Sequence, residues 1–146
     1  MLSVPFPLRF LFARDPAVMG KVLGIVYRAI ATHLIRKAGH TKTTAQTGAV
    51  TLIQCLGGAL NLNIHFHMIF VDGVYIAGAP DSRVRFRWVK APTSEELNQL
   101  THTIAQRIAR YLERQGFLVR DAENSYLTYD GMDADQQSPI NQLLGS

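Results

Sequence analysis

Two histidines separated by one residue stand inside an apolar run, NLNIHFHMIFV, which covers residues 61–71. A neutral imidazole is a common ligand for divalent metal ions, so the spacing of His65 and His67 points to possible metal chemistry. In an extended strand, residues two apart share a face with their Cα atoms roughly 6.6 Å apart, so two imidazoles can converge on one cation. The alternate residues are large and apolar and are expected to face the core: Ile64, Phe66, Met68 and Phe70.

A third ligand is expected from the preceding strand. If the turn GGALN (57–61) centres near residues 59–60, Gln54 lies opposite the two histidines and offers an amide oxygen. Two imidazoles and one amide oxygen leave coordination positions open, which suits a divalent ion that must also bind substrate. No carboxylate lies nearby in sequence, which argues against a purely structural zinc site.

The register of this strand pair leaves alternatives open. A slip of one residue would place Cys55 or Ile53 on the histidine face instead. Asn61 and Asn63 compete as the third ligand. A half-exposed strand can also carry two histidines without binding any metal, so the pair alone does not establish a site.

Two helices are expected to support the strands. The first begins at an N-cap, Asp15, and ends near Gly39, which is a natural helix stop. The second begins with the capping-box spacing of Thr93 and Glu96 and ends at Gly116.

Five strands are predicted from β-branched, aromatic or alternating residues. They cover residues 4–12, 49–55, 63–71, 74–77 and 83–90. Asp72-Gly73, between two apolar runs, indicates a hairpin turn. The element order predicts an α+β fold with a mainly antiparallel central sheet of about five strands and two main helices on one face.

Charge is distributed unevenly along the chain. Residues 121–146 carry five acids and no base, although the whole chain has a net charge of +4. We therefore interpret residues 1–120 as the core domain and residues 121–146 as an acidic irregular tail. A basic body suits a polyanionic partner such as nucleic acid, although simple solubility also explains it.

Basic residues on one predicted strand are candidate DNA contacts. In RVRFRWVK (83–90), Arg83, Arg85 and Arg87 share one face, with apolar residues on the other. We interpret this row as a phosphate contact, and protection of a sheet edge by charge is the alternative. Lys42, in the polar loop 40–48, is a further candidate for contact with the DNA backbone.

The sequence has few residues or segments that indicate disulfide chemistry, a targeting signal or a membrane span. The single cysteine excludes an intramolecular disulfide and a CxxC metal site. The apolar start lacks a basic region and is interrupted by Pro5, Pro7 and Arg9, which argues against a signal peptide. No apolar run is expected to reach the length of about 20 residues that a membrane span needs. We therefore expect a cytoplasmic protein with no membrane partner.

Longer stretches around the histidines resemble one protein family. GAVTLIQ (48–54) and GGALNLNIHFHMIFVDGVY (57–75) are similar to the rolling-circle transposases of bacterial insertion sequences, the two-tyrosine type of HUH endonucleases. SVPFPLRFLFA (3–13), APTSEELNQL (91–100) and RQGFLV (114–119) also resemble that family. The resemblance covers nearly the whole chain.

The resemblance implies DNA transposition through nicking and strand transfer of single-stranded DNA at insertion-sequence ends. In such enzymes the two motif histidines and a third polar ligand hold a divalent ion, Mg or Mn, which polarises the scissile phosphate. A tyrosine attacks phosphorus and leaves a 5′-phosphotyrosine link. His65 and His67 match the motif histidines, and Gln54 is the expected third ligand.

The nucleophile is where the sequence departs from the family. The family's tyrosine lies on a helix downstream of the histidines, often as a pair one turn apart. Tyr126 and Tyr129 have nearly that spacing, but their acidic segment would repel a DNA phosphate, so they are weak candidates. We therefore expect a fragment that carries the metal half of the site, lacks the nucleophile and binds DNA without cleaving it.

Two other functions remain open from the sequence. One is a non-catalytic nucleic-acid-binding module that uses aromatic stacking. The other is a metal-dependent oxygenase or hydrolase, which would need a carboxylate or third histidine aimed at the pair. The sequence indicates neither the target DNA sequence nor the oligomeric state.

Overall fold

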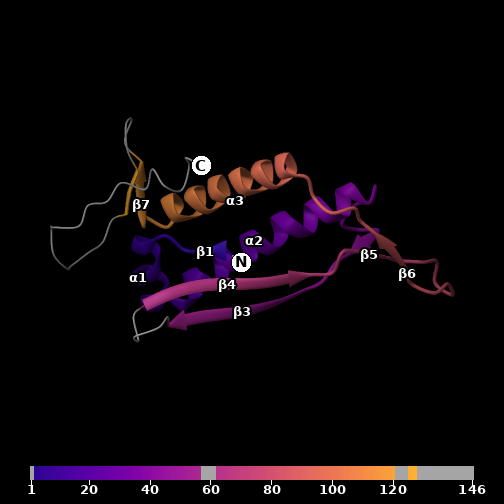
Figure 1. Ribbon diagram of the computed structural model, residues 1–146, viewed down its shortest axis with the longest axis horizontal. Helices are drawn as coiled ribbons and strands as arrows, with labels where there is room; N and C mark the ends of the chain where they lie inside the picture. The colour runs from indigo at the N-terminus through magenta and orange to yellow at the C-terminus, as the bar shows by residue number, and fades with distance from the viewer. Residues whose placement is uncertain (1, 57–61, 121–124, 128–146) are drawn as a thin grey trace.

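The computed structural model describes residues 2–56, 62–120 and 125–127 (Figure 1). The helices are α1 (Phe6–Arg14), α2 (Pro16–Lys37) and α3 (Ser94–Arg114). The strands are β1 (Leu2–Ser3), β2 (Ala45–Gln46), β3 (Ala49–Leu56), β4 (Leu62–Phe70), β5 (Gly73–Ile76), β6 (Arg85–Trp88), β7 (Leu118–Arg120) and β8 (Ser125–Leu127).

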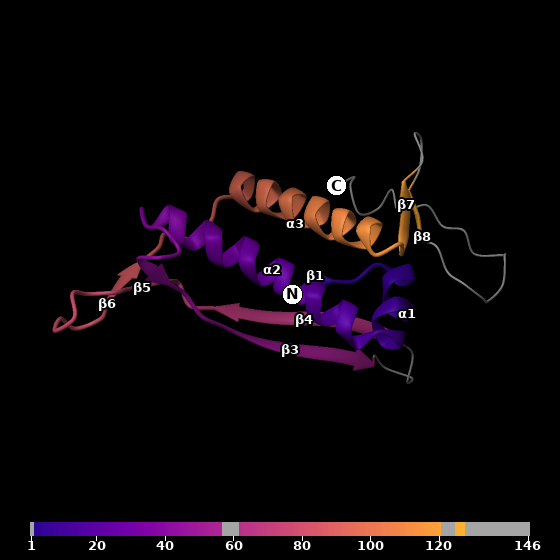
Figure 2. The same ribbon diagram turned by 180° about the vertical axis from the view of Figure 1, so that it is seen from behind.

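The described strands form two three-stranded sheets, ordered β1-β4-β3 and β2-β5-β6, and the hairpin β7–β8. Every pairing is antiparallel. The predicted α+β class is therefore confirmed, but the strands are divided between two sheets and do not form one. The helices lie on one side of the two three-stranded sheets, as Figures 1 and 2 show from opposite directions.

The first predicted strand, residues 4–12, was wrong over its whole length. Strand β1 covers only Leu2–Ser3, and the prolines belong to the start of helix α1. Pro5 is the N-cap and Pro7 lies in the first turn, where its fixed φ and missing N–H are tolerated. The buried side chains follow the helical spacing i, i+3, i+4: Leu8, Leu11 and Phe12.

The hairpin predicted at Asp72-Gly73 is also wrong. β5 does not fold back on β4, because it pairs with β2 and β6. β2–β3 and β4–β5 instead run as one long antiparallel ribbon with an irregularity between the two sheets. There the Val71 N–H donates to the Gly48 carbonyl at 3.0 Å, and Thr47 Oγ1 donates to the Gly73 carbonyl at 2.9 Å. The actual hairpin joins β5 to β6.

Both predicted helix boundaries are confirmed by their caps. The Asp15 carboxylate accepts from two backbone N–H groups of the first turn of α2, and Thr93 and Glu96 form a complete capping box on α3. Gly39 and Gly116 follow the C-caps with φ of 79° and 77°. Their N–H groups and those of the next residues return to the last turn, as in a Schellman motif.

Helix α2 is long and apolar enough to cross a membrane by length and composition, contrary to the expectation from sequence. Its buried side chains nevertheless belong to the main hydrophobic cluster of the described chain. They are contributed at helical spacing and include Val18, Val22, Val26 and Ala29. α2 therefore makes the contacts of a core helix.

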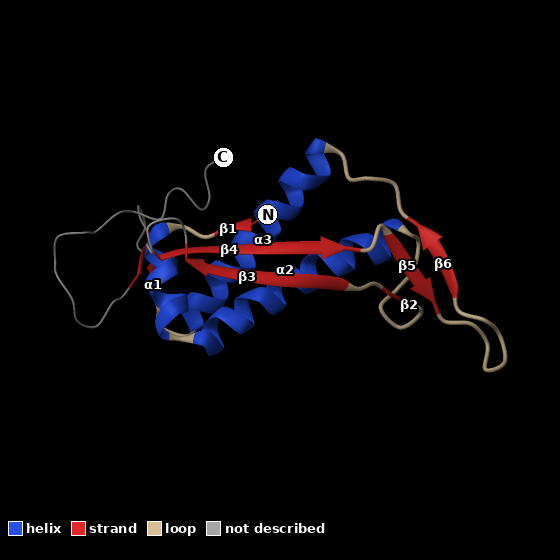
Figure 3. Cartoon of the chain, turned by 60° about the horizontal axis from the view of Figure 1, so that its bottom comes forward, coloured by secondary structure: helices blue, strands red, loops and turns tan. Residues whose placement is uncertain are grey.

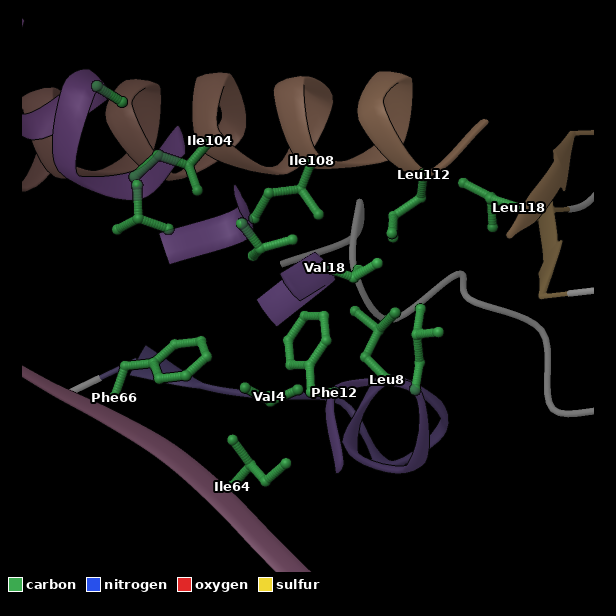
Figure 4. Packing of buried hydrophobic residues seen from close by; sticks show 14 residues of the cluster. Val4, Leu8, Phe12, Val18, Ile64, Phe66, Ile104, Ile108, Leu112 and Leu118 are labelled. Atoms are coloured by element: carbon green, nitrogen blue, oxygen red, sulfur yellow. The ribbon is translucent and has the colours of Figure 1, made fainter. Parts of the chain in front are cut away.

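The main cluster joins the three helices to β4. Phe12 of α1 and Phe66 of β4 are each 1% exposed, with ring centroids 6.1 Å apart. Ile104, Ile108 and Leu112 point from α3 toward this centre (Figure 4). A smaller cluster joins the end of α2 to the second sheet and contains Ile35, Ala38, Ala45 and Val74. α2 thus covers the same side of both sheets.

The segment predicted to be an irregular tail contains one described strand. β8 pairs with β7, and the register places Val119 opposite Tyr126. The rest of residues 121–146 lies outside the described residues, so the tail remains a prediction there.

Acid is expected to weaken the contact between α2 and α3. Lys37 Nζ lies 2.6 Å from Glu96 Oε2, and this hydrogen bond, with that of the Thr93 N–H, holds the pKa of Glu96 below its ordinary value of 4.5. Because the folded pKa is lowered, the stabilisation is present at neutral pH and is lost as the pH falls below 4.5 through the folded pKa.

Replacing Glu96 with glutamine tests this linkage, because glutamine can keep the capping hydrogen bond but not the charge. The variant should have a lower Tm than the wild type at pH 7, and the difference should shrink as the pH falls below 4.5. Thermal unfolding followed by circular dichroism across this range measures it. Glu95→Gln is the control, and an equal pH dependence in both variants would contradict the assignment.

Candidate functional site

The sheet β1-β4-β3 has one face against the helices and one face turned away from them. We call the second the outer face, and Figure 3 shows the strands in front of the helices from this side. On β4, Ile64 and Phe66 are 1% exposed, whereas His65 and His67, which alternate with them, are partly exposed. The strand alternation predicted for the two histidines is therefore confirmed.

The register brings Gln54 to the histidines. Gln54 lies directly opposite His65, and its Oε1 is 3.3 Å from His67 Nε2. The ring centroids of the two histidines are 6.5 Å apart. The register predicted from the turn is thus confirmed. The alternative slip, which would have placed Ile53 or Cys55 on this face, does not occur.

These side chains fit a divalent ion chemically. Adjacent ligands of an octahedral ion with bonds near 2.1 Å lie about 3.0 Å apart, close to the separation of the Gln54 and His67 atoms. His65 Nδ1 is buried and has no hydrogen-bond partner among the described residues. No three His, Cys, Asp or Glu side chains gather anywhere in the described part of the chain, so an ion here would depend on amide or hydroxyl oxygens.

Two more polar residues lie on the outer face. Ser3 of β1 is opposite His65, on the other side from Gln54. The sequence pattern does not indicate Ser3, because no periodicity reveals the partner of a two-residue strand. Asn63 precedes His65 by two residues on the same face and stays an alternative third ligand. Asn61, the other alternative, lies outside the described residues.

The three predicted arginines lie at the second sheet. Arg85 and Arg87 belong to the edge strand β6, and Arg83 precedes it. All three are exposed, and none of their side chains has a hydrogen-bond or ion-pair partner within the described ranges. They are available to an anion, although they do not surround the histidines. Their contact with DNA stays a prediction.

Lys42 lines a cavity of about 280 Å³ between α2 and the loop that follows it. A second cation, Arg28, lines the same cavity, and neither has an ion-pair partner in the described chain. Thr32 also lines it, with a buried Oγ1 that has no described hydrogen-bond partner. The sequence gives no separate signal for Arg28, because α2 also carries Lys21 and Arg36.

Of the two weak tyrosine candidates, the structure describes the backbone of Tyr126 alone. Tyr126 lies in strand β8, whereas the resemblance implies a nucleophile on a helix. Tyr129 lies outside the described residues. Tyr111 of α3 is partly buried and packs against the main cluster, so its environment is that of a residue at the edge of the core.

The comparisons with known proteins give one positive result. Residues 48–137, more than half of the 146, match the family described as "Putative transposase". The matched range begins at the start of β3 and contains both histidines, Gln54 and the three arginines. No curated protein and no solved structure matches the chain significantly. The chain therefore belongs to this transposase family.

Proposed function

We propose that the chain binds single-stranded DNA and holds one phosphate at a divalent-ion site, Mg or Mn, formed by His65, His67 and Gln54. This would be the metal half of a rolling-circle transposase of the HUH type, acting in nicking and strand transfer at insertion-sequence ends. The observation that carries the proposal is the pair of histidines beside Gln54 on an outer sheet face, within a member of a transposase family.

The strand pairing supports this role. β4 is the central strand, hydrogen-bonded to β1 on one side and β3 on the other, so its backbone positions both imidazoles. Phe66, between them, anchors the strand in the core. A divalent ion bound there would offset negative charge on the phosphate oxygens. No segment of the described chain covers the outer face, so a DNA strand can approach it (Figure 3).

The cations supply phosphate contacts away from the histidines. Arg85, Arg87 and Lys42 are exposed, and their charges would hold the DNA backbone without reading its sequence. We assign the nucleophile to no described residue. The proposed role of this chain is therefore binding and positioning, with cleavage requiring a tyrosine that the described residues do not supply.

The double variant His65→Ala/His67→Ala tests the metal site. Mn²⁺ should raise the affinity of the wild-type chain for a labelled single-stranded oligonucleotide by roughly tenfold or more, since the ion neutralises phosphate charge. The variant should lose this gain and keep its metal-free affinity. Fluorescence anisotropy with and without Mn²⁺ measures both, and circular dichroism checks that the variant is folded.

His102→Ala is the matched control, because His102 is exposed on α3, where it pairs with Gln106. It should behave as the wild type. A Mn²⁺ gain that persists in the double variant would contradict the metal site. DNA binding that ignores both Mn²⁺ and the histidines would support the alternative function, a non-catalytic nucleic-acid-binding module.

A further inference from the structure

Three aromatic side chains gather on the second sheet, and we call them the aromatic platform: Tyr75, Phe86 and Trp88. Tyr75 of β5 is opposite Phe86 of β6, with ring centroids 5.0 Å apart and planes at 61°. Phe86 and Trp88 meet at 5.3 Å and 89°. Both contacts are edge-to-face, a favourable arrangement of aromatic quadrupoles. Phe86 therefore joins the other two rings into one cluster.

The aromatic platform faces away from the helices. Trp88 is 72% exposed and Tyr75 47% exposed, whereas Val74, on the other face of β5, is completely buried in the smaller cluster with α2. Val84, two residues before Phe86, is also exposed. An exposed apolar patch of this kind is typical of a binding surface.

The backbone of Gly73 supports the central ring of the aromatic platform, Phe86, in a defined position. A Cβ at Gly73 would lie 2.5 Å from Phe86 Cζ and 2.3 Å from the Arg87 carbonyl oxygen. The Phe86 ring thus lies directly over the Gly73 backbone, which only a glycine permits. The central ring is held by the chain beneath it as well as by its aromatic neighbours.

The basic composition of the segment that carries Phe86 and Trp88 favours a nucleic acid. The segment 83–90 carries Arg83, Arg85, Arg87 and Lys90 and no acidic residue. None of these cations has a partner among residues 2–56, 62–120 and 125–127. Arg85 and Arg87 lie on the opposite face of the edge strand β6 from the rings, since Arg87 is opposite Val74. In a single-strand binding surface bases stack on aromatic rings and phosphates pair with cations, and here these arginines would contact phosphates around the sheet edge. Duplex DNA keeps its base faces stacked and cannot use such a surface in this way.

We infer that the aromatic platform stacks the bases of single-stranded DNA, independently of metal. The inference rests on the proposed DNA-binding function but uses different residues. Alternation continues along the ribbon from β4 to β5, because Ile64 and Phe66 and then Val74 all face clusters that contain α2. The histidines and Tyr75 therefore lie on the same side, away from α2, and one strand can contact both.

The fluorescence of Trp88 tests the inference directly, because Trp88 is the only tryptophan in the chain. Single-stranded oligo-dT should quench its emission in EDTA, whereas a duplex of equal length should quench it much less. Tyr75→Leu and Trp88→Leu should each weaken binding of a labelled oligo-dT by about tenfold, the usual order for loss of one base–aromatic stack. Anisotropy measures the affinities, and circular dichroism checks folding.

Phe10→Leu is the matched control, since Phe10 is 45% exposed and packs edge-to-face on Phe6 in α1. It should bind as the wild type. Wild-type affinity in both platform variants, or equal quenching by duplex, would overturn the inference. So would a dimer that is seen without DNA and is lost in Trp88→Leu, because the rings would then be a protein interface.

The proposal of the metal site and the inference of the aromatic platform can be contradicted separately. Quenching without any effect of Mn²⁺ would support the platform and contradict the metal site. A Mn²⁺ gain that depends on His65 and His67, without quenching of Trp88, would contradict the platform and leave the metal site standing. The double histidine variant should still quench as the wild type does.

Discussion

Replacing Phe66 with alanine is expected to lower the free energy of unfolding by about 3–5 kcal/mol, the range for truncating a buried phenylalanine. Phe66 is 1% exposed, and its ring packs beside Phe12, so the change would leave a cavity where β4 meets α1. Since small domains are stable by only about 5–15 kcal/mol, much of the stability would be lost. Urea denaturation followed by circular dichroism gives the difference.

Ile53→Ala is the matched control for this prediction. Ile53 lies directly opposite Phe66 on β3 but is 42% exposed, so its truncation should cost much less. Equal losses in the two variants would show that the helices do not depend on Phe66 for their packing. Because Phe66 stands between the histidines, Phe66→Ala should also reduce any binding that requires both imidazoles in place.

Replacing Gly73 with alanine is expected to destabilise the chain by about 1–3 kcal/mol, the usual range for overpacking. The added methyl group would collide with the Arg87 carbonyl oxygen as well as with Phe86. A backbone atom cannot turn aside as a side chain can, so β5 and β6 must separate. Urea denaturation measures the stability, and a change in Trp88 emission reports the displaced aromatic platform.

Gly20→Ala should have the opposite sign and is the control. Gly20 lies in helix α2, and nothing lies within 4 Å of a Cβ added there. Alanine should therefore stabilise the helix by about 0.5–1 kcal/mol. If Gly73→Ala were as stable as the wild type, the close approach of Phe86 to the β5 backbone would be disproved.

Local signals in the sequence predicted the supports of the site well. Asp15, the Thr93 and Glu96 pair and Gly116 each act through backbone groups within a few residues, so sequence spacing is enough to find them. The position of Gln54 was predictable because only residues 57–61 lie between β3 and β4, and so short a connection limits the register.

Strand pairings and buried faces that depend on residues distant in the sequence were not predictable from the same patterns. The prolines near the start fit a strand edge as well as a first helical turn, and only burial of Leu8 and Phe12 against the core decides for the helix. Asp72-Gly73 has strong hairpin chemistry, yet pairing of β5 with β2 and β6 prevails. Strict alternation in β6 separates two faces but does not say which one a helix covers, so the exposure of Trp88 had no sequence signal.

The placement of the histidines and Tyr75 on one side of the ribbon has a consequence for where a DNA strand would be cut. Tyr75 follows His67 by eight positions in the sequence, which limits the span to about 26 Å at the rise of an extended chain. A strand with the B-form rise of 3.4 Å would cover this in about eight nucleotides, and a stretched strand in fewer. Bases held at one end would then fix which phosphate reaches the other, so the ribbon would act as a molecular ruler.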